Sequence, residues 1–248
     1  MGKIALLAFA LSSLYAQAPI DWNKCTTTTS CSFVIATPGA TSIFIQGGCV
    51  LTTCGPISIA TVPVNALSCI LGPTAGSGSS TVSGILCFTL APSPSATVTV
   101  NVTACPAFCF AAGASFSGTT TQDGSIASNA SMNSPTYVLS LGPVVPTGTD
   151  DLVISGVAVY CQGTAGTLDA ASSFIVLQNT CDPSVMGGAI AYKVSSVSEF
   201  MTWFADNGDS GALGMTGQMV AVKRATYGAH SASYGCNFGF QQHFGFSY

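Results

Sequence analysis

Short runs of alternating, β-branched residues constrain the fold of this chain more than any other feature. The clearest runs are 42–45, 57–62, 96–102 and 152–160, each bounded by Gly, Pro, Ser or Asn. Helical periodicity is almost absent after the first residues. Short strands separated by turn signals predict an all-β, antiparallel sandwich or jelly roll.

The two halves of the chain repeat the same order of features. The repeated segments pair as 33–47 with 137–156, 84–90 with 188–194, and 114–117 with 220–223. Repetition at this spacing indicates one supersecondary design used twice. We therefore predict two tandem, jelly-roll-like β-sandwich modules from an internal duplication, 19–118 and 119–226.

Eleven cysteines predict a disulfide framework in an oxidising compartment. Cys49 and Cys69 lie 20 residues apart, as do Cys161 and Cys181, and the two pairs are related by one offset of 112. We predict equivalent disulfides, Cys49–Cys69 and Cys161–Cys181. Each would stabilise its module by roughly 3 kcal/mol.

The other cysteines allow fewer conclusions. Cys105 and Cys109 either staple a loop or pair with Cys54 or Cys25, and Cys87 is expected to be a buried free thiol. The odd count leaves one thiol over, and the pairing of these cysteines stays open: Cys25, Cys31, Cys54, Cys87, Cys105, Cys109 and Cys236.

Residues 1–18 resemble a secretory leader. Lys3 supplies the positive charge, residues 4–14 form the apolar segment, and Ala16-Gln17-Ala18 matches the A-x-A cleavage motif. The apolar segment is shorter than the ~20 residues that span a bilayer, so no stable membrane span is expected. Pro19 disfavours cleavage, which leaves processing open. We predict a secreted protein on a cell or virion surface.

Charge is scarce. The chain has 5 Lys or Arg and 9 Asp or Glu in 248 residues, and none from Cys25 to Gln122. With no basic patch to neutralise phosphates, nucleic-acid binding is not expected. An uncharged surface also lacks the usual protection against self-association, which suits burial in an assembly, a glycan cover or an acidic medium.

Several sequence stretches resemble a β-sandwich module found in secreted microbial surface proteins and phage structural proteins. They are Asn65-Ala-Leu, Gly84-Ile-Leu-Cys-Phe, Ala96-Thr-Val-Thr-Val-Asn-Val and Ala114-Ser-Phe-Ser-Gly, and the segments from Asp150-Asp-Leu-Val-Ile to Val220-Ala-Val look similar. The resemblance covers 33–225. It implies a non-catalytic sandwich and transfers no site residues.

No constellation makes a convincing enzyme, cofactor site or metal centre. Gly208-Asp209-Ser210-Gly211 matches a serine-protease nucleophile motif, but His230 and His243 both follow the serine. Asp206, Asn207 and Asp209 lack the spacing and terminal Glu of an EF-hand. Polar turns explain both stretches better.

Other polar and aromatic residues have structural interpretations. Asp150 and Asp151 are interpreted as strand-entry charges rather than a catalytic dyad, and Trp22 and Trp203 as core or interface packing. Asn101 and Asn129 begin candidate glycosylation sequons.

The C-terminal arm, 227–248, carries aromatic residues at alternate positions: Phe238, Phe240, Phe244, Phe246 and Tyr248. A strand with this pattern has one aromatic face. It either closes the chain's own sheet or adds to a sheet of a neighbouring subunit. It also resembles the closing strand of an outer-membrane barrel, which the cysteines and the sandwich-like turns argue against.

These observations predict a non-enzymatic structural subunit of an extracellular filament, pilus-like appendage or virion coat. Its partners would be copies of itself, with glycan or a host surface as a further contact. A monomeric adhesin or lectin-like module is the main alternative. A secreted hydrolase is less favoured because it requires a polar cleft with perturbed titrating groups.

Overall fold

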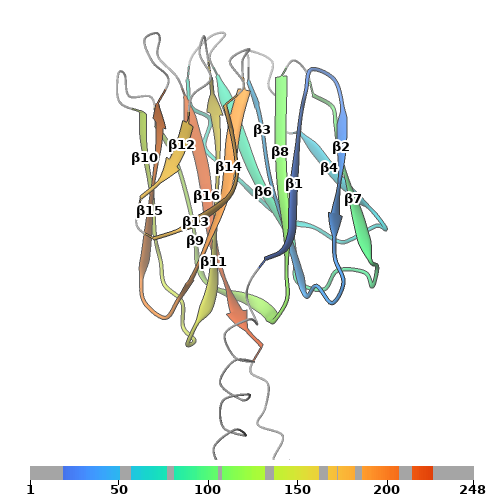
Figure 1. The fold of residues 1–248 in the computed structure, drawn as a ribbon. Coiled ribbons are helices and arrows are strands. Elements are labelled where there is room, and N and C mark those ends of the chain that lie inside the picture. The colour runs from blue at the N-terminus through green and yellow to red at the C-terminus, as the bar shows by residue number, and fades with distance from the viewer. Residues whose placement is uncertain are drawn as a thin grey trace, which may run out of the picture.

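The computed structural model describes residues 19–50, 57–76, 81–105, 108–131, 137–161, 167–171, 173–181, 186–206 and 214–225. Within these ranges the regular structure is entirely β, in four antiparallel sheets, which confirms the predicted sandwich class. In Figure 1 the first module, blue to green, stands beside the second, yellow to red.

The first module pairs a five-stranded sheet with a three-stranded one. The larger sheet has the order β1 (Pro19–Thr27), β8 (Phe108–Phe116), β3 (Ser42–Val50), β6 (Val82–Thr89), β5 (Ser68–Leu71). The smaller has the order β2 (Cys31–Ala36), β7 (Thr97–Thr103), β4 (Ser58–Val62).

The second module repeats this topology strand for strand. Its larger sheet has the order β9 (Thr119–Ser131), β16 (Met215–Arg224), β11 (Asp151–Tyr160), β14 (Met186–Ser195), β13 (Ile175–Cys181). Its smaller sheet has the order β10 (Tyr137–Val144), β15 (Glu199–Asp206), β12 (Thr167–Ala170). The shared order places the repeated sequence segments on equivalent strands, as an internal duplication requires.

The two five-stranded sheets pack face to face and form the inner layers of a four-layer stack. β3 packs on β11, β6 on β16 and β8 on β14. Since β6 corresponds to β14 and β8 to β16, an approximate twofold axis relates the modules. Gly84 on β6 accordingly faces Thr216, while its counterpart Gly188 faces Phe110. We call these sheets inner and the three-stranded sheets outer.

Burial along the strands follows this layering. On β7, in an outer sheet, Val98, Val100 and Val102 are buried, and the residues between them point outward. This alternation is typical of a sheet with one solvated face. Every residue of β3 and β11 is buried because both faces of an inner sheet are covered. The larger of two buried apolar clusters extends from the interior of the second module across the interface to the first module, and the smaller lies between the two sheets of the first module.

The disulfides correct part of the sequence prediction. Cys69 is bonded to Cys87, so the predicted Cys49–Cys69 pairing is wrong, and so is the free thiol predicted at Cys87. The reason is register: β5 and β6 are neighbours, and they place these two cysteines directly opposite each other with Cα atoms 4.0 Å apart.

The other described cysteines confirm one predicted bond and leave another untested. Cys105 is bonded to Cys109, which confirms the loop staple, and Cys25 is bonded to Cys31. Cys49 and Cys161 are disulfide-bonded as well. The predicted Cys161–Cys181 bond depends on the Cys181 side chain, which lies outside the described part of the structure.

Candidate functional site

Several predicted site residues lie outside the described residues. These are the aromatic residues of the arm, the 208–211 motif, and Asn207 and Asp209 of the candidate calcium loop. Residues 1–18 lie outside them as well.

The remaining predictions fall on described strands. Trp203 is fully buried, and its indole N–H donates to Ser155 Oγ at 3.0 Å, which confirms core packing. Trp22 is 42% exposed and is not a core residue. Asp151 begins β11 and Asp150 precedes it, as expected of strand-entry charges.

The two sequon asparagines differ in their surroundings. Asn101 lies on β7 among the outward-facing positions of the outer sheet. Asn129 lies on β9, and its side-chain amide donates to the Ser140 carbonyl at 2.9 Å. The Asn129 side-chain nitrogen, which would carry a glycan, is therefore already engaged in a hydrogen bond within the fold.

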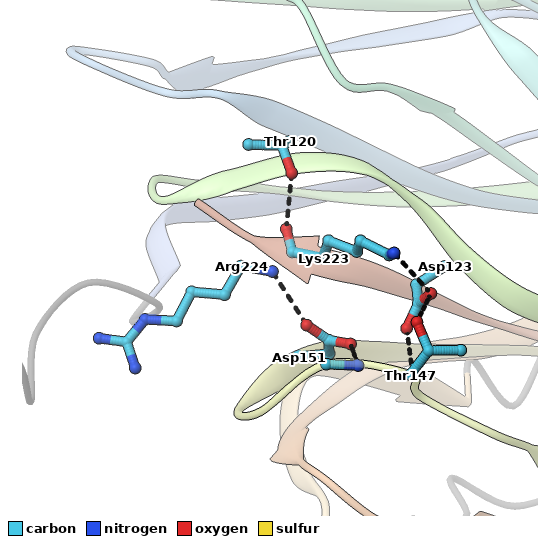
Figure 2. A network of polar contacts seen from close by, with 7 residues as sticks. Thr120, Asp123, Thr147, Asp151, Lys223 and Arg224 are labelled. Carbon is cyan, nitrogen blue, oxygen red and sulfur yellow. Dashed lines mark hydrogen bonds and ion pairs between the residues drawn. The ribbon is translucent and has the colours of Figure 1, made fainter. Parts of the chain in front are cut away.

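Charged residues gather at one end of the second module, around two buried carboxyl groups (Figure 2). Asp123 on β9 and Asp151 on β11 are 3% and 1% exposed. Thr147 donates to Asp123 through its backbone N–H and, at 2.6 Å, through its hydroxyl. Lys223 Nζ lies 3.7 Å from the same carboxylate.

Asp151 receives backbone donors from two different segments. The N–H groups of Gly148 and Arg224 donate to its two oxygens at 2.9 and 3.0 Å. The Arg224 guanidinium reaches Asp150 at 3.2 Å. The cluster thus joins the 145–150 loop, the start of β11 and the end of β16.

The pKa values of the two carboxyl groups shift in opposite directions. Burial raises the pKa of Asp151, and the neighbouring Asp123 carboxylate raises it further. Burial also opposes ionisation of Asp123, but the hydrogen bonds from Thr147, with help from Asp151 and Lys223, lower its pKa to about 2. When the pair holds a single proton, these shifts place it on Asp151.

A third buried acid, Glu199, lies beside this cluster. Glu199 at the start of β15 is 5% exposed, and its carboxylate accepts bonds from Lys193 Nζ at 2.8 Å and from the Ser195 hydroxyl. Ser195 is directly opposite Asp151 in the β11–β14 pairing. The Glu199 carboxylate is therefore paired within the fold, by one ion pair and one hydroxyl donor.

An open groove of about 480 Å³ lies near the start of β9, between the edges of the two inner sheets. Its lining is neutral: Ala66, Ser68, Phe88, Thr89, Leu90, Ala91, Thr120, Thr121 and Gln122. The opposite edge of the molecule is bridged, because Lys24 Nζ on β1 donates to the Asn179 carbonyl on β13 at 3.1 Å. The groove offers hydroxyl, amide and apolar contacts without charge.

Sequence reasoning missed Asp123 and the groove. One signal was available, because Asp123 is the first charged residue after the uncharged stretch that ends at Gln122. Its partner Asp151 lies on another strand, and only the fold brings the two together.

Among the described residues, no group of three or more His, Cys, Asp or Glu could hold a metal ion. That same part of the chain contains no helix long and apolar enough to cross a membrane. No protein-family model matches the chain, and neither curated proteins nor solved structures give a significant match.

Proposed function

We propose that this protein is a non-enzymatic structural subunit of an extracellular surface assembly, filament-like or coat-like, that associates with copies of itself. The observation that carries this proposal is the chemistry of the two outer sheets, whose solvent faces combine exposed apolar side chains with almost no charge. Exposed apolar surface of this kind favours contact with other protein surfaces.

The outer face of the first module is neutral. Val34 on β2 is 47% exposed and Val62 on β4 is 58% exposed. Between them β7 presents Thr97, Thr99, Asn101 and Thr103. No Lys, Arg, Asp or Glu occurs on these three strands.

The outer face of the second module is more aromatic. Phe200 and Phe204 on β15 are 58% and 42% exposed, and Asp169 on β12 lies opposite Phe204. The two outer faces terminate opposite ends of the four-layer stack, and their chemistry differs. Contact between unlike faces of successive copies would be heterologous and open-ended, which is the geometry of a filament.

The disulfides support an exported protein. Three intramolecular disulfides occur among the described residues, and such bonds are compatible with an extracellular, oxidising environment. All three lie within the first module, between residues 25 and 109. Glycan or a host surface remains a proposed further partner.

The size of native protein in non-reducing solution tests the proposal. We expect the wild-type chain to form large particles, and Phe204→Asp or Val34→Asp to reduce their size because each buries a charge at the contact. Ser128→Asp, on an exposed position of β9 outside both outer faces, is the matched control. A discrete wild-type monomer would contradict the assembly function.

The groove favours one alternative, a monomeric adhesin or lectin-like module. Its neutral hydroxyl and amide lining suits a neutral ligand such as a glycan. Binding of defined oligosaccharides by a monomeric wild-type chain, lost in Thr121→Arg, would support this alternative over assembly.

A further inference from the structure

We propose that the groove between β5 and β9 is the acceptor for the aromatic segment 238–248 of a second copy of this chain. This inference rests on the proposed self-assembly and adds the site and the occupant. Four observations carry it: the position of β5 and β9 at sheet edges, the apolar part of the lining, the absence of charge, and the point at which the chain leaves the fold.

β5 and β9 are the last strands of the two inner sheets on this side of the molecule. A strand at a sheet edge has backbone N–H and C=O groups available to another strand. An added strand gains affinity from main-chain hydrogen bonds and specificity from pockets for alternate side chains.

Part of the groove lining is apolar. Inside, Phe88, Leu90 and Ala91 supply apolar surface. Alternate aromatic side chains would remove this surface from water, since each buried aromatic ring removes ~150–250 Å².

The absence of charge on both surfaces favours the arm over an acidic or basic partner. None of the lining residues is charged, and segment 238–248 contains Phe, Tyr, Gly, Gln and Ser with one His and no Asp, Glu, Lys or Arg. The two surfaces can meet without burying an unpaired charge.

The chain leaves the fold beside the groove. Arg224 lies opposite Thr119 in the β9–β16 pairing, and the Ala225 N–H donates to the Gly118 carbonyl at 2.7 Å. The arm therefore starts next to the lining residues 120–122. Residues 226–237 can span up to roughly 40 Å when extended, which is enough to reach a neighbouring molecule.

We favour a second copy as the source of the aromatic segment because the point where the arm leaves the fold and the groove lie on the same face of the molecule. Two copies that meet at this face around a twofold axis can exchange arms reciprocally, and each contact is then made twice. For the chain to fill its own groove, residues 226–237 would have to reverse direction on the surface that carries the acceptor.

Photo-crosslinking in mixed assemblies tests the proposal. Unlabelled full-length chains with a benzoylphenylalanine in place of Phe240 are co-assembled with ¹⁵N-labelled wild-type chains. We expect crosslinks from position 240 to labelled peptides that contain 66–68, 88–91 or 120–122. Crosslinks confined to the unlabelled chain that carries the probe, or to labelled peptides elsewhere, would overturn the proposal.

A pair of variants on one strand adds a second readout. Thr121→Arg places a charge in the groove and should lower the labelled crosslink yield roughly tenfold, because an unpaired charge is costly to bury. Ser128→Arg, exposed on β9 outside the lining, should leave the yield unchanged. Equal yields for the two variants would count against the groove.

Failure of this inference is distinguishable from failure of the proposed function. Assembly of the wild-type chain with crosslinks outside the groove refutes only the acceptor. A wild-type chain that stays monomeric refutes both. Deletion of 227–248 with unchanged assembly likewise refutes the arm and leaves association through the outer sheets intact.

Discussion

Asn23 and Asn129 make the same pair of hydrogen bonds in the two modules. Asn23 donates to the Val34 carbonyl at 3.0 Å and accepts from the Lys24 N–H at 2.9 Å. Asn129 donates to the Ser140 carbonyl at 2.9 Å and accepts from the Ala130 N–H at 2.8 Å. In both modules the asparagine ties the first strand of the inner sheet to the first strand of the outer sheet.

This equivalence predicts equal stability losses. Asn23→Ala and Asn129→Ala should each lower the free energy of unfolding by about 1 kcal/mol, the usual net value of such bonds. Chemical denaturation of both variants measures this. A loss at one site only would show that the bonds are not equivalent.

The same bond bears on glycosylation. In a secretory host that adds N-glycans, we expect higher occupancy at Asn101 than at Asn129, because a glycan at Asn129 would replace an N–H of the bonded amide group. Mass spectrometry of the two tryptic or chymotryptic peptides measures occupancy. Full occupancy at Asn129 with little at Asn101 would contradict this expectation.

The carboxyl pair predicts an acidic stability optimum. The raised pKa of Asp151 gives stability that is fully present below the ordinary value of 3.8 and is lost as the pH rises through the raised value. The lowered pKa of Asp123 gives stability that is present above 3.8 and is lost as the pH falls toward about 2. We therefore expect the thermal midpoint near pH 4 to exceed that at pH 7.

Asp151→Asn tests the origin of this optimum. The amide cannot ionise, so the decline in thermal midpoint between pH 4 and pH 7 should flatten. Asp169→Asn, which removes an exposed carboxylate on β12, should keep the wild-type profile. A wild-type profile in Asp151→Asn would separate the pH dependence from this pair.

The packing of glycines between the two inner sheets gives another prediction. A Cβ at Gly188 would lie 2.2 Å from Phe110 Cε1 and 2.7 Å from the Val157 carbonyl oxygen, whereas at Gly84 the nearest atom is a Thr216 methyl group at 2.8 Å. Gly188→Ala should therefore destabilise the fold by ~1–3 kcal/mol, and Gly84→Ala by less.

Phe110→Leu provides the coupled variant for this test. Added to Gly188→Ala, it should cost less than the sum of the two single changes, because the smaller side chain vacates the space that the new methyl group needs. Strict additivity in urea unfolding would show that the two residues are not packed against each other.

The disulfide between β5 and β6 gives a prediction with a chemical readout. Removing it by Cys69→Ala with Cys87→Ala should lower the free energy of unfolding by about 3 kcal/mol, as expected for a loop of this size. Non-reducing peptide mapping should link the peptides that carry residues 69 and 87. A peptide that links residues 49 and 69 would contradict the structure.

The sequence by itself determined the class of fold and its duplication. Alternation within residues 96–102 and 42–45, with turn residues between runs, is a local property, because side chains on a strand alternate faces whatever the rest of the chain does. The repeated segments also lie on equivalent strands. The Cys105–Cys109 staple could be foreseen because its two residues are close in sequence.

Only the tertiary structure decided which distant residues meet. Cys69 pairs with Cys87, rather than with Cys49, because strand register and not sequence spacing sets the distance between two Cα atoms. Asp123 and Asp151 lie 28 positions apart, and neither stretch of sequence shows that their strands flank β16. The packing of one inner sheet on the other is likewise non-local, because any apolar face predicts burial without naming the surface that covers it.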